Sequence, residues 1–100
     1  QENLAYEQSE LRRIIVEAAS DVENSTKEVE KMQEQVEADS IASRLTTRKY
    51  EEGLASSIDV KTAAVTLLQS RVRLLQSQLT MAYNKKLLAY YKGEKLWTDL

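Results

Sequence analysis

The chain contains no cysteine, histidine, proline or phenylalanine, and only two glycines and one tryptophan among 100 residues. Without cysteine it forms no disulfide and no thiolate metal site, and without histidine it lacks the usual partner of a catalytic nucleophile. The carboxylates are spread over a charged face with lysine and arginine nearby, so no pair is set apart for acid–base work. We therefore expect neither an enzyme nor a bound cofactor or metal.

The chain also lacks a long apolar run and a strong overall charge. No run approaches the roughly 20 residues that a membrane-spanning helix needs. The net charge is −2, with eleven acids and four bases in residues 1–40 and five acids and ten bases in residues 41–100. The two parts could attract each other in an antiparallel pair. No basic cluster stands free of acids or alternates with aromatics, so we expect no nucleic-acid binding.

What the chain has instead is a composition typical of long helices, rich in leucine, alanine, glutamate, glutamine and lysine. A first helix is predicted at about residues 3–52. Apolar or small residues recur there in alternating steps of four and three, as in a coiled-coil seam. These positions are Leu11, Ile15, Ala18, Val22, Ser25, Val29, Met32 and Val36. Because Asp39 and Ser43 come next, the pattern predicts that the seam shifts to Ala38, Ile41, Ala42 and Leu45.

A turn is predicted at about residues 53–56. Gly53 can take the left-handed conformation that ends a helix. Ser56 is a good N-cap, and Asp59 three residues later completes a pattern that resembles a capping box. A second helix is therefore predicted at about residues 57–92, ending just before Gly93.

The second helix carries two apolar stripes, which together are too wide for one partner helix. The first consists of Ile58, Val65, Leu68, Val72, Leu75, Leu79 and Ala82, and the second of Val60, Ala64, Leu67, Leu74, Met81 and Leu88. The remaining arc is polar: Thr62, Thr66, Gln69, Ser70, Gln76, Ser77, Thr80 and Asn84. We expect this helix to have neighbours on both flanks.

Folding the chain at Gly53 pairs residues whose numbers add to about 110, for example Leu45 with Val65 and Ile41 with Leu68. Residues 1–17 then extend beyond the second helix, and their apolar side chains need cover. The tail at residues 96–100 could supply it. Otherwise the cover is missing, which indicates that residues 1–100 are a single hairpin domain taken from a larger protein.

The side chain of Leu54 is the open question at the turn. The residues that it would meet one turn earlier, Arg48 and Lys49, are charged, so the usual apolar contact after a helix-ending glycine is absent. Leu54 either folds onto the second helix or remains exposed as a contact for a partner. Because single exposed apolar residues are common, the pattern alone favours an ordinary turn. Tyr50 either shields the turn or bonds to a neighbouring hairpin.

From about Ala42 to Trp97 the chain resembles the TolC family of outer-membrane efflux ducts. The likeness lies in the segment from Arg48 to Val60, with its Tyr-x-x-Gly, Ser and Asp-Val elements. A Leu/Gln-rich helix and a Leu/Tyr segment ending at Gly93 follow. The first forty residues resemble the preceding family helix only in a general way.

The resemblance implies a periplasmic hairpin from the α-barrel of a trimeric outer-membrane protein of the Gram-negative cell envelope. The membrane would be met only through β-strands outside this chain. Partners would be a periplasmic adaptor (membrane fusion) protein and an inner-membrane pump. The tip that docks the adaptor and forms the entrance would comprise Tyr50, Gly53, Leu54, Ala55, Ser56 and Asp59. The alternative hypothesis is a soluble scaffolding antiparallel coiled coil unrelated to export.

Overall fold

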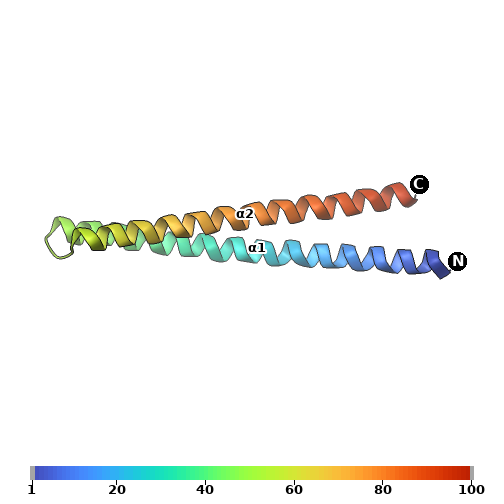
Figure 1. Cartoon of the computed structure of the whole chain (residues 1–100), viewed down its shortest axis with the longest axis horizontal. Helices are drawn as coiled ribbons and strands as arrows, with labels where there is room; N and C mark the ends of the chain where they lie inside the picture. The colour runs from blue at the N-terminus through green and yellow to red at the C-terminus, as the bar shows by residue number, and fades with distance from the viewer. Residues whose placement is uncertain (1, 100) are drawn as a thin grey trace. The chain divides into compact units, whose positions relative to one another are not determined.

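The computed structural model describes residues 2–99, with side chains described for residues 6–93. Helix α1 runs from Glu2 to Glu51 and helix α2 from Ser57 to Asp99. A turn at residues 52–56 joins them, and the helices run in opposite directions (Figure 1). The predicted all-α antiparallel two-helix hairpin is therefore confirmed.

The hairpin packs as two units, each containing a piece of both helices. The terminal unit combines residues 1–27 with residues 79–100, and the tip unit comprises residues 28–78. In the tip unit the Ser70 hydroxyl donates a hydrogen bond to the Asp39 carboxylate. In the terminal unit the Asn84 amide donates one to the Ser25 hydroxyl. The residue numbers add to 109 in both pairs, within one residue of the predicted pairing offset.

The predicted end of the second helix near Lys92 is wrong, because α2 continues to Asp99. Gly53 is the only glycine with a positive φ in the described part of the chain. A glycine ends a helix through the left-handed conformation, whereas within a helix it costs only about 1 kcal/mol relative to alanine. The tail through Asp99 is thus helical. The side chains of residues 96–100, one possible source of cover for residues 1–17, lie outside the described residues.

The predicted shift of the α1 seam after Val36 is also wrong. The side chains of Asp39, Ser43 and Thr46 are partly buried, whereas Ile41 and Leu45 are 44% and 52% exposed. The alternating steps of four and three therefore continue unbroken through polar residues. The seam keeps its phase because the polar side chains find partners: Asp39 bonds to Ser70, and the Thr46 hydroxyl bonds to the Ala42 carbonyl at 2.8 Å.

Only one face of α2 packs against α1. Ten partly or fully buried positions recur in the same alternating steps: Val60, Ala63, Leu67, Ser70, Leu74, Ser77, Met81, Asn84, Leu88 and Tyr91. Leu87 and Gly93 are also partly buried and lie beside this series. The second predicted apolar stripe thus faces α1, apart from Ala64. Ser70, Ser77 and Asn84, which the pattern grouped in the polar arc beside the two apolar stripes, all lie in the seam.

Ion pairs among the described residues join neighbours along α1. Arg13 pairs with Glu10 and with Glu17, and Lys27 pairs with Glu23 at 3.5 Å. These exposed contacts within one helix contribute little to stability. The opposite charges of the two helices are therefore not matched by direct ion pairs across the seam in the described part of the hairpin.

Candidate functional site: the tip and the outer face of α2

The end of α1 is closed by a Schellman motif centred on Gly53. The Leu54 N–H donates to the Lys49 carbonyl at 2.6 Å, and the Gly53 N–H donates to the Tyr50 carbonyl at 3.0 Å. Gly53 has φ 77°, the left-handed conformation predicted for it. These bonds satisfy carbonyls that have no partner within the helix, so the chain leaves α1 in a defined direction.

The start of α2 is closed by a reciprocal capping box. The Asp59 N–H donates to the Ser56 hydroxyl at 3.2 Å, and the Ser56 N–H donates to the Asp59 carboxylate at 3.0 Å. The bond from the Ser56 backbone, followed by that from its hydroxyl, lowers the pKa of Asp59 below its usual value. Asp59 is therefore charged at neutral pH and suits the positive end of the helix dipole.

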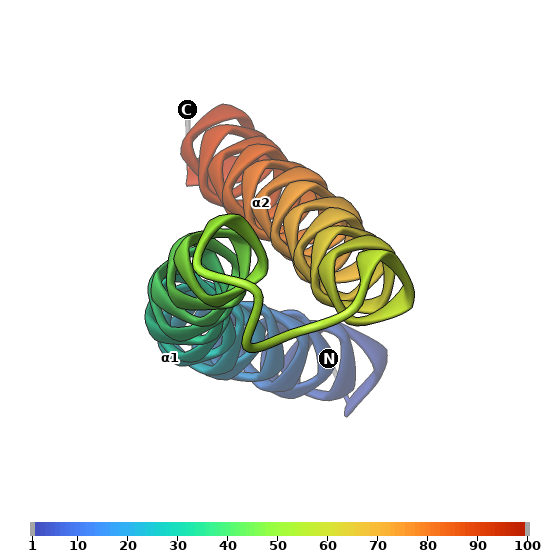
Figure 2. The ribbon, with the colours of Figure 1, turned by 90° about the vertical axis from the view of Figure 1, so that its left-hand side faces the viewer.

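Figure 2 looks onto the turn end-on and shows the chain crossing from the end of α1 to the start of α2. Leu54 lies on this crossing and is 73% exposed, so it does not fold onto α2. Ala55 is partly buried, and Tyr50 is exposed at the last turn of α1. The tip therefore offers one large apolar side chain, Leu54, on a backbone that is held by two caps.

The six predicted site residues fall into two groups. Gly53, Ser56 and Asp59 build the turn through backbone conformation and capping bonds. Leu54 and Tyr50 take part in the turn only through their backbone hydrogen bonds, and both of their side chains are exposed. Ala55 belongs to neither group, because it forms neither cap and its side chain is partly buried. Among the six, Leu54 and Tyr50 are thus the side chains available for contact.

A second exposed feature runs along the outer face of α2 in the tip unit. It is an apolar stripe, here called the outer stripe, formed by Ile58, Val65, Leu68, Val72 and Leu75. Their exposed fractions range from 46% to 71%. The spacing again alternates between three and four, apart from one longer step across Lys61, so the stripe has the pattern of a second coiled-coil seam. All five residues remain exposed beside the described part of α1.

The outer face of α1 carries a smaller patch in the same unit, here called the α1 patch. It consists of Ile41 and Leu45, flanked by exposed Ala38 and Ala42. At the observed offset of 109, Ile41 lies level with Leu68. These two residues were predicted to pack on each other, yet both are exposed on the outside of the hairpin.

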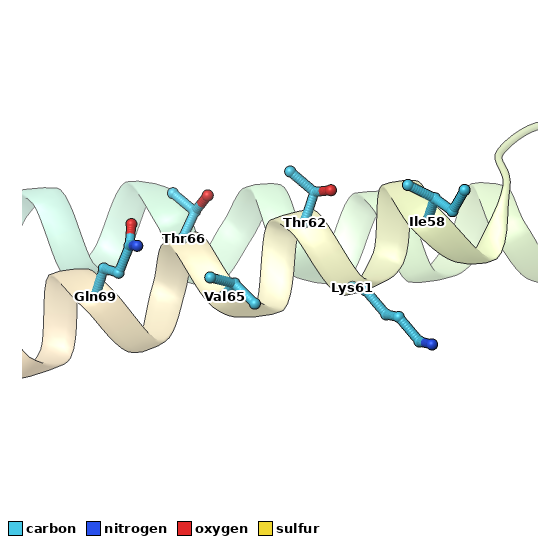
Figure 3. A pocket seen from close by; sticks show the side chains of 6 residues that line it. All are labelled: Ile58, Lys61, Thr62, Val65, Thr66 and Gln69. Atoms are coloured by element: carbon cyan, nitrogen blue, oxygen red, sulfur yellow. The ribbon is translucent and has the colours of Figure 1, made fainter.

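A shallow groove lies at the tip end of α2 (Figure 3). Its lining residues are Ile58, Lys61, Thr62, Val65, Thr66 and Gln69, all from this one helix. Figure 3 shows the Lys61 side chain pointing away from the threonines. A small-molecule site needs walls that enclose most of the ligand. A groove on a single helix supplies only one wall, so it does not enclose a small ligand.

No group of three or more metal-binding acidic side chains converges within the described residues. In the described part of the chain, neither helix has an apolar stretch long enough to span a membrane.

The cross-helix bonds Ser25–Asn84 and Asp39–Ser70 were missed by the sequence analysis. One signal was present: residues 63, 70, 77, 84 and 91 recur at intervals of seven, and they are small, polar or aromatic.

In comparisons with known proteins, no family matches the chain, and neither a curated protein nor a solved structure is significantly similar to it.

Proposed function

We propose that the chain is a wall segment of a TolC-like export duct, whose tip docks a periplasmic adaptor protein. The observation that carries this proposal is the outer stripe of α2. A hairpin that acts alone has no use for a second exposed coiled-coil seam, whereas a helix in a barrel wall packs on a neighbour at each flank. The exposed Leu54 gives the tip an apolar contact for the adaptor. The role is passive, without catalysis.

The position of the α1 patch supports packing between copies. Because Ile41 lies level with Leu68, a second copy with its tip pointing the same way can lay its α1 patch on the outer stripe. Charge favours this contact as well. Residues 28–51 hold six acids and four bases, whereas residues 57–78 hold one acid and three bases. The contact would join helices of opposite net charge, which favours a neighbour's α1 over a second α2.

Packing between copies can be tested with cysteines, since the chain has none of its own. Two single variants, Ile41→Cys and Leu68→Cys, are mixed and oxidised. The proposal predicts a disulfide-linked dimer that joins one variant to the other. Glu34→Cys mixed with Leu68→Cys is the control, because Glu34 lies two helical turns from the level of Leu68. Equal yields in the two mixtures would contradict the proposed contact.

Docking at the tip is tested by Leu54→Glu in crosslinking to an adaptor protein from the same organism. We expect the crosslink at the tip to be lost while helicity remains. Val16→Glu is the matched control, because Val16 is similarly exposed, at 67%, but lies in the terminal unit. A crosslink that survives Leu54→Glu would show that the tip is not the docking site.

The alternative is a scaffolding coiled coil that works outside export. The gene that encodes the chain separates the two functions. A duct requires alternating β-strands and an earlier, similar hairpin upstream, and a gene with neither would leave the scaffold as the better explanation.

A further inference from the structure

The seam of the hairpin contains two polar side-chain pairs that join α1 to α2. Asn84 donates its amide to the Ser25 hydroxyl, and a second contact from the same nitrogen reaches the Asp21 carbonyl at 3.4 Å. The Ser25 hydroxyl in turn donates to the Asp21 carbonyl at 2.6 Å. Ser25 is only 9% exposed. Asn84 is partly buried, and this pair links the two helices in the seam.

The second pair lies in the tip unit. The Ser70 hydroxyl donates to one oxygen of the Asp39 carboxylate, and the Gln35 amide donates to the other at 3.1 Å. Ser70 is 5% exposed. Within the described residues, no buried side-chain nitrogen or oxygen lacks a partner. Both polar pairs thus have all their buried groups satisfied at one alignment of the helices.

Apolar packing alone does not select this alignment strongly. The apolar seam positions recur every seven residues on both helices, so a slide by one heptad again places apolar side chains opposite one another. The polar pairs respond differently. A slide in one direction brings Asn84 level with Met32, and a slide in the other brings it level with Ala18. Either move takes the partly buried Asn84 amide away from the Ser25 hydroxyl and places it beside an apolar side chain in the seam, which is unfavourable for a polar group.

Asp39 adds a second constraint in one of these directions. The slide that brings Asn84 level with Ala18 also places Asp39 opposite Ala63, where no hydroxyl can donate to its carboxylate. We propose that the pairs Ser25–Asn84 and Asp39–Ser70 fix the register of the two helices and that their main contribution is a unique alignment rather than stability. Buried polar residues in coiled-coil seams have this use elsewhere.

The register can be measured with two spin labels. Glu30→Cys and Thr62→Cys place labels at exposed positions on opposite helices of the tip unit. A slide by one heptad changes their separation along the helix axis by about 10 Å. Pulsed electron–electron resonance reads this distance, and dilution with unlabelled protein removes distances between copies. The parent chain is expected to give a single distance.

The test variant replaces all four partners: Ser25→Leu, Asp39→Leu, Ser70→Leu and Asn84→Leu. We expect it to show added distances about 10 Å from the parent value and to unfold at the same or a higher temperature. The control carries Thr46→Leu and Ser77→Leu, which also add leucine to the seam. Their hydroxyls bond within their own helices, so the control should keep the single distance.

A single parent distance in the fourfold variant would overturn the proposal, because the turn at Gly53 would then fix the register by itself. If the fourfold variant fails to fold by circular dichroism, the pair variant Ser25→Leu with Asn84→Leu takes its place. The pair variant removes the Ser25–Asn84 hydrogen bond, which a slide of the helices in either direction would break. A single distance in the folded pair variant would also overturn the proposal.

Discussion

Ser56 and Asp59 hold each other through two reciprocal hydrogen bonds, each from the backbone N–H of one residue to the side chain of the other. Three residues earlier, Gly53 closes α1 through its left-handed backbone. The turn thus consists of two caps back to back. This arrangement explains how a five-residue connection can present Leu54 to solvent on an ordered backbone.

The first prediction concerns pH at this cap. Because the pKa of Asp59 is lowered in the folded hairpin, its contribution to stability is present above the ordinary aspartate pKa of about 3.9. It is lost as the pH falls through the lowered folded value. We expect the Ser56 amide to lose protection against hydrogen exchange in that acidic range. In Asp59→Asn, which cannot titrate, this acid-dependent loss should disappear. If the variant and the parent show the same loss, the carboxylate is not its cause.

The second prediction uses the two glycines, which should respond oppositely to the same change. A Cβ added at either position meets no atom within 4 Å, so only backbone conformation distinguishes them. Gly53→Ala forces alanine into the left-handed region and should cost about 1–2 kcal/mol. Gly93→Ala lies within a helix and should stabilise it by about 1 kcal/mol. Denaturant unfolding followed by circular dichroism measures both effects.

Gly53→Asn provides the control for the first of these changes. Asparagine tolerates the left-handed region better than alanine does, so its loss of stability should be smaller. Equal losses for asparagine and alanine would mean that φ at Gly53 is not what limits substitution there.

Local chemistry was enough to predict the turn and the two helices, apart from the end of α2. The Gly53 stop, the Ser56 cap and the role of Asp59 depend on residues within one helical turn, so the sequence contains all of the relevant partners. The exposure of Leu54 was only one of two alternatives. Choosing between them required knowing whether α2 offers Leu54 a surface, and that is a tertiary property.

The seam between Val36 and Thr46 could not be assigned in the same way. Counting apolar residues favoured Ile41 and Leu45, because Asp39 looked too costly to bury. That cost depends on Ser70, a residue 31 positions away that satisfies the Asp39 carboxylate. The same reasoning placed Ser70 in the polar arc, apart from the apolar stripes. Each residue was misplaced because its partner was unknown, and assigning the two together would have corrected both.

The last prediction separates the two faces of α2 with neighbouring leucines. Leu67 lies partly buried in the seam, whereas Leu68 belongs to the outer stripe and is 60% exposed. In dilute protein, Leu67→Ala should cost about 2 kcal/mol, the low end for leucine-to-alanine changes in cores. Leu68→Ala should change stability by less than about 0.5 kcal/mol, as surface substitutions usually do. Thermal unfolding at low concentration measures both, and helix propensity cancels because the change is the same.

Raising the protein concentration extends this comparison to the contact between copies. If a neighbour's α1 patch covers the outer stripe, Leu68→Ala should weaken self-association in sedimentation equilibrium more than Leu67→Ala does. The reason is that Leu68 would be buried only in the assembly, whereas Leu67 is already covered within its own hairpin. Unchanged association in Leu68→Ala would place the contact elsewhere on the hairpin.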